Sequence, residues 1–273
     1  MKPFSPIVFV IFLFFSCNNS KKATSTPVRE ETTSGKKLPK DIIYLTARPD
    51  SISFDASGTA VIVVDMQNDF GSKGGMFDKA GIDISIIQQV IEPISNVLNV
   101  ARKRGIKIIY LKMGFKPDLS DVGGMEYPTR VKRLKRMHIG DTVIAPNGTI
   151  GRILVNNTWN TDIIPQLQPQ PNDIIVYKNR FNGFYQTTLD SILRSLEKKY
   201  LIITGCTTSV CVESTVRDAS FRNYMPIVLE DCTAEPIGNG LSRSNQEASL
   251  LVIKTSFGLV STSNEFIKSL EKH

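Results

Sequence analysis

The chain has 273 residues, of which 41% are hydrophobic, and its 33 Lys and Arg residues outnumber its 26 Asp and Glu residues. This length and hydrophobic content suit one large α/β domain with a well-buried core. The net charge of +7 is too diffuse to indicate nucleic-acid binding, whereas it is compatible with an anionic small substrate or an acidic membrane surface.

The N-terminus has the pattern of a targeting segment. Lys2 is followed by apolar residues from 4 to 15, a length that suits a signal peptide, since a membrane span needs about 20 residues. Ser16-Cys17 then resembles a bacterial lipobox. We therefore expect residues 1–17 to be a lipoprotein signal peptide with Cys17 as the lipidation site, in an exported bacterial lipoprotein held on the periplasmic side of a membrane or cell envelope. A secreted protein without lipid and a cytoplasmic protein are the alternatives.

Residues 18–40 are polar, rich in Ser, Thr and Lys, and without apolar periodicity. Such a composition cannot bury enough surface to fold, so we expect a flexible polar tether over residues 18–51 and the folded domain over 52–273. With Cys17 assigned to lipid, the three cysteines Cys206, Cys211 and Cys232 remain. An odd number at irregular spacing does not indicate a disulfide framework.

Short apolar segments alternate with helical patterns along the predicted domain. We expect strands at 60–64, 106–111, 173–177, 200–204, 226–230 and 250–254, and helices at 83–104, 187–197, 209–222, 242–249 and 262–271. Gly105 is the predicted C-cap of the first helix. The alternation predicts a three-layer α/β/α sandwich with a mainly parallel, Rossmann-like six-stranded sheet. Residues 112–172 show little periodicity and are expected to be a substrate-covering loop region.

Three reactive side chains follow three of these strands. Asp65 follows the strand at 60–64, Lys178 follows 173–177, and Cys211 lies just beyond a glycine turn after 200–204. Ligands of open α/β sheets bind beyond the carboxyl ends of the strands, so we expect the three side chains to converge there.

The three residue types suit nucleophilic catalysis. A thiolate attacks carbonyl carbon, and the first turn of a helix is expected to lower the pKa of Cys211. Asp65 can accept the thiol proton and return it to a leaving nitrogen, while Lys178 holds the carboxylate. Each residue alone has a plainer explanation as a packing, capping or solvated group.

Three motifs carry a family resemblance: VIVVDMQNDF, VYKNRFNGFYQTTLDSILRS and LIITGCTTSVCVESTVRDASFRNYMPIVLED. Over about residues 58–265 the chain resembles the isochorismatase-like cysteine hydrolase superfamily, and within it members of the ureidoacrylate amidohydrolase and N-carbamoylsarcosine amidase type.

The resemblance implies a catalytic triad of Asp65, Lys178 and Cys211. It also implies a cis peptide before Thr207 and an oxyanion hole formed by the backbone N–H groups of Thr207 and Cys211. The implied reaction is cleavage of a C–N bond in a small linear amide or ureido (carbamoyl) substrate through a thioester, without a cofactor. Relatives are dimers or tetramers, so we expect a homo-oligomer and no nucleic-acid partner.

Two departures narrow the expected activity. The only histidines are His138 and His273, neither near Asp65 in sequence. We therefore expect no metal site, which weakens a nicotinamidase-like reading. Cys211 argues against isochorismatase activity itself.

Residues beside the triad motifs are candidates for lining a substrate pocket: Asn68, Phe70, Phe115, Asn182, Phe184 and Tyr185. Ordinary packing beside a turn is the alternative for each. The basic run at 129–136 is expected to be a solvated face, or else to attract an anionic substrate or acidic lipid headgroups.

Two other classes of function stay open on sequence grounds. One is a catalytically silent small-molecule binding module on the same fold. The other is a thiol–disulfide pair formed by Cys206 and Cys211.

Overall fold

The structure is a computed structural model, which describes residues 41–238 and 240–271. These residues belong to one compact unit. The predicted signal peptide, Cys17 and residues 18–40 of the predicted tether lie outside the described residues.

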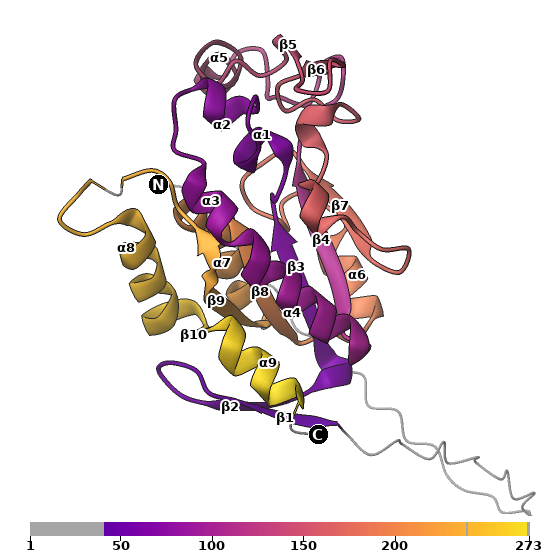
Figure 1. The fold of residues 1–273 in the computed structure, drawn as a ribbon, viewed down its shortest axis with the longest axis vertical. Coiled ribbons are helices and arrows are strands. Elements are labelled where there is room, and N and C mark those ends of the chain that lie inside the picture. Colours follow the sequence, from indigo (N-terminus) through magenta and orange to yellow (C-terminus); the bar gives the residue numbers. More distant parts are fainter. Residues whose placement is uncertain (1–40, 239, 272–273) are drawn as a thin grey trace, which may run out of the picture. The chain divides into compact units, whose positions relative to one another are not determined.

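Six strands form a central sheet in the order β10-β9-β8-β3-β4-β7, and every neighbouring pair is parallel (Figure 1). Their residues are mostly buried and many are β-branched, as expected where helices cover both faces. This confirms the predicted three-layer α/β fold. The strands are β3 (Thr59–Val64), β4 (Lys107–Met113), β7 (Ile174–Lys178), β8 (Tyr200–Cys206), β9 (Met225–Ala234) and β10 (Leu259–Ser261).

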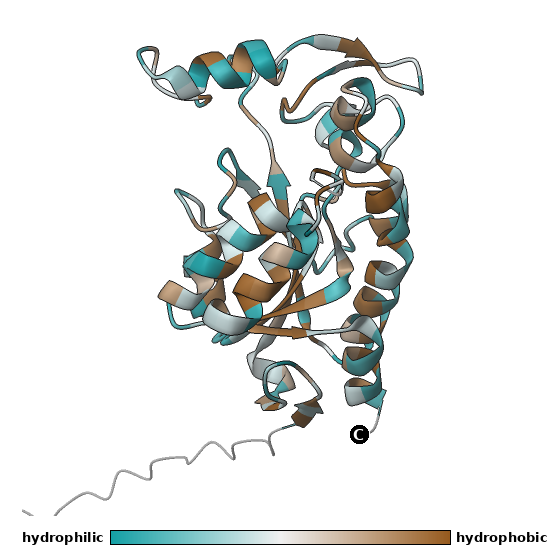
Figure 2. Cartoon of the chain, turned by 90° about the vertical axis from the view of Figure 1, so that its left-hand side faces the viewer, coloured by the Kyte–Doolittle hydropathy of each residue, from teal (hydrophilic) through white to brown (hydrophobic). Residues whose placement is uncertain are grey.

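Two groups of helices cover the two faces of the sheet. Figure 1 shows α4 (Ile91–Lys103) and α9 (Ser263–Glu271) in front of it, and α6 (Leu189–Ser195) and α7 (Glu213–Phe221) behind. Each group packs on its own apolar cluster. Figure 2 shows the hydrophobic strands between helices of mixed character. The remaining α-helices are α1 (Asn68–Gly71), α2 (Met76–Lys79), α3 (Ser85–Gln89), α5 (Pro128–Val131) and α8 (Asn245–Val252).

Gly105 ends α4 as predicted, with φ +67°. The predicted helix at 83–104 is divided into α3 and α4, and the helix at 209–222 begins as the π-helical turn η5 (Thr208–Val212) before α7.

The strand predicted at 250–254 is wrong. Ser244 and Glu247 form a capping box that starts α8. The helical backbone then continues through the turn η6 (Ile253–Phe257). Ser249 and Ile253 are buried four residues apart, which is the spacing of one helix face. The apolar run therefore packs as a helix, and the sixth strand is β10.

The predicted boundary between tether and domain also needs correction. Strand β1 (Ile42–Leu45) pairs antiparallel with β2 (Ile52–Asp55). Ile43 and Leu45 are fully buried in the same apolar cluster as Phe266 of α9, because alternate residues of a strand point to one side. The described fold thus begins at Asp41 rather than at residue 52.

Residues 114–172 are called the insertion below. Its first part lies beyond the carboxyl ends of the strands, beside α1 and α2 (Figure 1), and its last residues return to the start of β4, where Lys107 donates to the carbonyl oxygen of Asn172. The insertion is not only loop, because Phe115, Ile139 and Leu154 are buried in the main apolar cluster. Besides α5, the insertion contains η2 (Lys132–Arg136), β5 (Thr142–Ile144) paired with β6 (Ile150–Arg152), η3 (Trp159–Thr161) and η4 (Pro165–Leu167). In the part of the chain that the structure describes, no helix is long and apolar enough to cross a membrane.

Candidate active site

A buried ion pair lies at the carboxyl edge of the sheet. Lys178 Nζ is 2.7 Å from Asp65 Oδ2, and neither side chain is more than 1% exposed. Asp65 follows β3 and Lys178 ends β7, so the pair reaches across the end of β4, which lies between those strands. Lys178 Nζ also donates to the carbonyl oxygen of Arg180 at 3.3 Å.

The backbone around Asp65 turns sharply out of β3. Asp65 has φ +52°, a left-handed conformation that Asp tolerates better than most residues. Its N–H donates to the carbonyl oxygen of Leu111, and its own carbonyl accepts from Gln67 N–H at 2.8 Å and from the Cys206 thiol at 3.3 Å. These contacts fix the carboxylate against the ends of β4 and β8.

Cys211 lies in η5, directly after a tight turn that leaves β8. Gly205 has φ +111°, and a Cβ at this position would lie 2.0 Å from the carbonyl oxygen of Val64, so only glycine lets β8 run this close to β3. The Cys206–Thr207 peptide is cis, which confirms that prediction. Cys206 and Cys211 are both free thiols, not a disulfide.

The thiol of Cys211 interacts with both members of the ion pair. Burial raises the pKa of Cys211, the Asp65 carboxylate raises it further, and the Lys178 ammonium opposes both. The lowered pKa expected from the helix start is therefore wrong, because loss of solvent outweighs the helix dipole at a side chain that is only 6% exposed.

Burial also raises the pKa of Asp65, with Lys178 acting in the opposite direction. Burial disfavours the charged form of Lys178, but attraction to Asp65 and Cys211 outweighs it and raises the pKa of the lysine. These shifts make the Cys211 thiol a weaker acid and the Asp65 carboxylate a stronger base, and they favour the charged form of Lys178.

A cavity of about 220 Å³ opens over Cys211. Its lining residues are apolar except for Cys211, Thr207 and Lys132. Of the predicted pocket residues, Phe70 lines it. The full lining is Phe70, Met76, Phe77, Met113, Lys132, Met137, Leu154, Phe181, Thr207, Val210, Cys211 and Ile237.

Sequence reasoning missed most of this lining. Phe181 lies within the quoted motif VYKNRFNGFYQTTLDSILRS and could have been found there. Met113 ends β4, two residues beyond the strand predicted at 106–111. Met137, Leu154 and Ile237 belong to irregular segments that no periodic pattern places near Cys211.

Two predicted pocket residues instead support the cavity from behind. Asn68 donates from Nδ2 to the carbonyl oxygen of Trp159 at 2.8 Å. Phe115 is fully buried, and its N–H donates to the carbonyl oxygen of Leu154, a lining residue.

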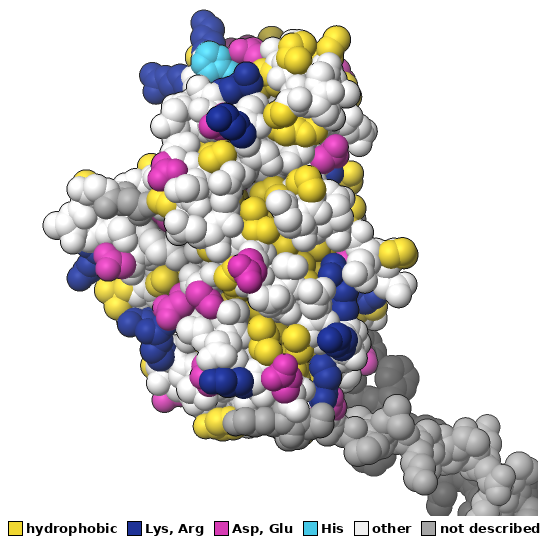
Figure 3. All heavy atoms as spheres, in the orientation of Figure 1, with side chains coloured by type: hydrophobic (Ala, Val, Ile, Leu, Met, Phe, Trp, Pro, Cys, Tyr) yellow, Lys and Arg dark blue, Asp and Glu magenta, His cyan; other side chains and the backbone are white. Residues whose placement is uncertain are grey.

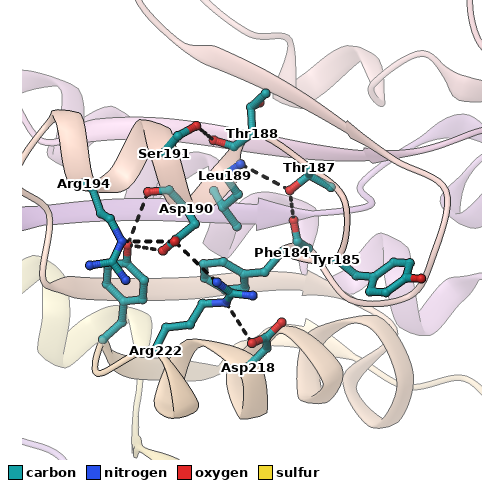
Figure 4. A network of polar contacts seen from close by, with 12 residues as sticks. Phe184, Tyr185, Thr187, Thr188, Leu189, Asp190, Ser191, Arg194, Asp218 and Arg222 are labelled. Carbon is teal, nitrogen blue, oxygen red and sulfur yellow. Dashed lines mark hydrogen bonds and ion pairs between the residues drawn. The ribbon is translucent and has the colours of Figure 1, made fainter.

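The other three predicted pocket residues are Asn182, Phe184 and Tyr185, which follow β7. Figure 4 shows Phe184 and Tyr185 beside a polar network that includes Asp218 and Arg222. Asn182 donates to Asp218 at 2.8 Å and accepts from the N–H groups of Phe184 and Tyr185. The ring of Phe184 is buried below the Arg222 guanidinium, 5.2 Å from its centroid. These residues hold the loop that leads to α6 and do not line the cavity, because their side chains point toward α7 or, for Tyr185, toward solvent.

Three consecutive polar residues after β3 fasten the insertion. Gln67 donates to the carbonyl oxygens of Met113 and Thr161 and accepts from Met113 N–H. Asn68 contributes the contact with Trp159. Asp69 is fully buried and accepts from the N–H groups of Met76 and Leu154 and from Asn160 Nδ2, at 3.0, 2.7 and 2.6 Å. Because Met76 and Leu154 both line the cavity, Asp69 joins two of its walls.

Two arginines are adjacent in sequence to lining residues of the cavity, Arg133 after Lys132 and Arg180 before Phe181. Lys132 is exposed at η2, while the Arg133 and Arg180 guanidinium groups donate to carbonyl oxygens nearby. Burial lowers the pKa of Arg133, and repulsion from Arg180 lowers it further, which places the two cations close together. Figure 3 shows Lys and Arg side chains gathered at the insertion end of the molecular face. Within residues 41–238 and 240–271, no three His, Cys, Asp or Glu side chains cluster as metal ligands would.

The fold and the buried thiol, carboxylate and ammonium place the chain in the class of α/β enzymes with a cysteine at the carboxyl edge of a parallel sheet. Residues 59–265 match the isochorismatase domain family, and the chain belongs to it. The prediction of an isochorismatase-like hydrolase is thereby confirmed.

Individual relatives agree with this membership. The chain is 41% identical over 224 residues to the ureidoacrylate amidohydrolase RutB of Pantoea ananatis, covering 81% of this chain and 86% of that protein. A cysteine hydrolase structure from Pseudomonas syringae is 31% identical with a TM-score of 0.66, covering 80% and 95%. The N-carbamoylsarcosine amidase of Thermoplasma acidophilum shares the fold at 22% identity and TM-score 0.55, covering 76% and 96%.

The prediction of an exported, membrane-anchored lipoprotein is wrong. It depended on the apolar residues 4–15 and on Cys17, a short compositional pattern outside the described residues. The relatives matched over most of the chain are named as ureidoacrylate amidohydrolases.

Substituting one member of the buried ion pair should destabilise the fold strongly. Asp65→Asn leaves the Lys178 ammonium buried without its counter-charge, so we expect the free energy of unfolding to fall by about 3–5 kcal/mol. Asp141→Asn removes an exposed carboxylate beside His138 and should change it by less than about 0.5 kcal/mol. Urea unfolding monitored by circular dichroism measures both, and equal losses in the two variants would contradict the structure.

Asp69 should make stability depend on pH in an unusual direction. Burial raises its pKa from 3.8 to about 6, against the effect of its hydrogen bonds. Between those two values the folded chain binds a proton that the unfolded chain does not, so its contribution to stability rises as pH falls from about 6 to about 4.

The measurement compares the wild type with Asp69→Asn by urea unfolding at several pH values. The wild type should gain about 2–3 kcal/mol relative to the variant across this window. A difference that is independent of pH would show that Asp69 titrates normally.

Proposed function

We propose that this chain is a cysteine-dependent amidohydrolase that cleaves a C–N bond in a small linear ureido or amide compound. The observation that carries the proposal is the fully buried Lys178–Asp65 ion pair, with Nζ and Oδ2 2.7 Å apart, interacting with the one thiol that lines the cavity. Burial of the Asp65 carboxylate is energetically unfavourable, and ionisable groups with shifted pKa values are common at catalytic sites. Next to the protonated thiol of Cys211, this carboxylate can act as the proton acceptor.

In this mechanism Asp65 takes the proton of Cys211 as Sγ attacks the substrate carbonyl carbon. Burial raises the pKa of both groups, which keeps the thiol protonated until substrate arrives and makes the carboxylate a stronger base. Lys178 holds Asp65 in position. The backbone N–H groups of Thr207 and Cys211, both residues of the cavity wall, receive the oxyanion.

The tetrahedral intermediate then loses its nitrogen. The C–N bond breaks as Asp65 returns the proton to the leaving amine, and a thioester with Cys211 remains. Water attacks this thioester and gives one proton to Asp65. The C–S bond breaks, the proton returns to sulfur, and the free acid leaves. From a ureido substrate the products are an amine and carbamic acid, which decomposes to ammonia and carbon dioxide.

The cavity supports a small substrate with an anionic end. Its volume of about 220 Å³ is below the usual range for drug-sized ligands. Lys132 is the one charged side chain of its lining. Relatives 37–41% identical are named as ureidoacrylate amidohydrolases, and ureidoacrylate combines a ureido group with a carboxylate. It is therefore the first compound to test, with Cys211 facing the ureido carbon and Lys132 facing the carboxylate.

Hydrolysis should depend on Cys211. We expect ammonia release from ureidoacrylate by the full chain, and a loss of about three orders of magnitude or more in Cys211→Ala, because the nucleophile is removed. Cys232→Ala is the matched control, since this buried thiol on β9 lies outside the cavity.

N-carbamoyl amino acids, biuret and nicotinamide complete the substrate panel. Turnover of nicotinamide alone would favour the nicotinamidase-like alternative. No turnover of any compound, with Cys211 inert to alkylation, would favour a silent binding module.

Lys132 should control affinity rather than chemistry. Lys132→Met is expected to raise KM for ureidoacrylate about tenfold with little change in kcat, because the lost ion pair is distant from the reacting bond. Lys135→Met changes an exposed neighbour in η2 that does not line the cavity. The same KM in both variants would contradict recognition of the anionic end by Lys132.

A further inference from the structure

A second buried carboxylate contacts the turn that carries Cys211. Glu235 follows the last residue of β9 and is 1% exposed. Its Oε2 accepts hydrogen bonds from both the N–H and the hydroxyl of Ser209, at 2.9 and 2.5 Å, and its Oε1 accepts from the N–H of Ile237 at 3.0 Å.

These partners belong to two walls of the cavity. Ser209 lies between Thr207 and Cys211, which both line it, and Ile237 lines it from the loop after β9. The β8–β9 register places Cys206 beside Ala234, so the carboxylate projects directly at the start of the turn. One side chain therefore holds the nucleophile turn and the opposite loop together.

The position also has an electrostatic meaning. Ser209 is in the first turn of a continuous helical segment, η5 followed by α7, whose N–H groups there have no helical acceptors. A carboxylate at this end is attracted by the helix dipole. The positive end of the helix thus faces Glu235 rather than the sulfur of Cys211, which agrees with a thiol that stays protonated despite its place at a helix start.

We propose that Glu235 is a positioning residue for Cys211: it orients the Thr207–Cys211 turn through Ser209 and occupies the positive end of the helix. This inference rests on the proposed hydrolase function. With Glu235 at the positive end of the helix, the dipole does not deprotonate Cys211. Asp65 then takes the thiol proton as the substrate is attacked, so the nucleophile is generated only in the presence of substrate.

The charges around Cys211 come from four elements. Asp65 follows β3, Lys178 ends β7, Glu235 follows β9, and Lys132 faces the cavity from η2. At Cys206, which precedes the turn, burial raises the pKa of the thiol most, and Glu235 adds to that effect. At Cys211 the expectation rests on geometry. Glu235 contacts the first helical turn through Ser209, so removing its charge should leave the positive end of the helix free to favour the thiolate.

The test uses the full chain and the variants Glu235→Gln, Ser209→Ala and Glu230→Gln. Glu230 is on β9, the strand that Glu235 follows, and it pairs with Arg48 at the surface, so its variant is matched in chemistry but lacks contact with the turn. Alkylation of Cys211 by iodoacetamide is followed from neutral to alkaline pH and assigned by peptide mass mapping, since other cysteines are present. Steady-state kcat and KM for ureidoacrylate are measured in parallel.

In Glu235→Gln we expect the pH profile of Cys211 alkylation to move to lower pH and kcat to fall about 10- to 100-fold with a smaller change in KM, because the oxyanion donors lose alignment. Ser209→Ala keeps the Glu235 carboxylate and its hydrogen bond from the N–H of residue 209. The pH profile of Cys211 alkylation should therefore stay unchanged in this variant, and kcat should fall less than in Glu235→Gln. Glu230→Gln should match the wild type.

An unchanged alkylation profile in folded Glu235→Gln, together with wild-type kcat, would overturn the proposal. If Glu235→Gln does not fold, wild-type kcat in Ser209→Ala overturns it and reduced kcat with an unmoved profile supports it. Alkylation needs no substrate, so a chain without any hydrolase activity would still reveal whether Glu235 controls the thiol. Failure of the proposed function and failure of this inference are therefore distinguishable.

Discussion

The structure depends most on one interaction, the ion pair between Asp65 and Lys178 inside the carboxyl edge of the sheet. Two charges without solvent are unfavourable unless they meet in good geometry, and here they meet at 2.7 Å across the end of β4. That requirement ties together strands that are 113 residues apart in sequence. It also leaves a basic carboxylate next to the thiol of Cys211, so the same burial that strains the pair gives the site its chemistry.

The insertion turns this edge of the sheet into an enclosed site. Gln67, Asn68 and Asp69 are consecutive after β3, and each binds the insertion between Leu154 and Thr161 through side-chain oxygen or nitrogen atoms. The motif that supplies Asp65 therefore also builds the wall opposite Cys211. Apolar side chains of the insertion and the single charged lining residue, Lys132, then restrict which molecules can reach the thiol of Cys211.

Much of the fold was predictable because its signals are local and repetitive. Five strands are apolar runs of β-branched residues, and the parallel order of α/β units brings their carboxyl ends to one edge, so Asp65, Lys178 and Cys211 could be placed together without a structure. The strand predicted at 250–254 was wrong because the composition of this apolar run suits a strand, whereas Ser244 and Glu247 begin a helix that continues into it. A capping box is a sequence signal, and giving it priority over composition would have corrected the error.

The rest of the site could not be predicted for a physical reason. Whether an aromatic residue lines a cavity or packs behind it depends on contacts between segments far apart in sequence. Phe181 and Phe184 are three residues apart in one motif, yet the first lines the cavity and the second lies beneath Arg222. Glu235 likewise gains its importance from Ser209, on a different element, and nothing in its own neighbourhood marks it.

The location of Lys178 on β7 has a consequence for how the protein loses activity. This strand is the last of its sheet, it pairs only with β4, and Ile175 and Tyr177 on its outer side are 41% and 46% exposed. Edge strands separate from a sheet at lower free energy than central ones. Local fraying of β7 would withdraw the ammonium from Asp65 while β3 and β8 remain paired. Under the proposed mechanism, inactivation on mild heating would then come before global unfolding and would be reversible on cooling.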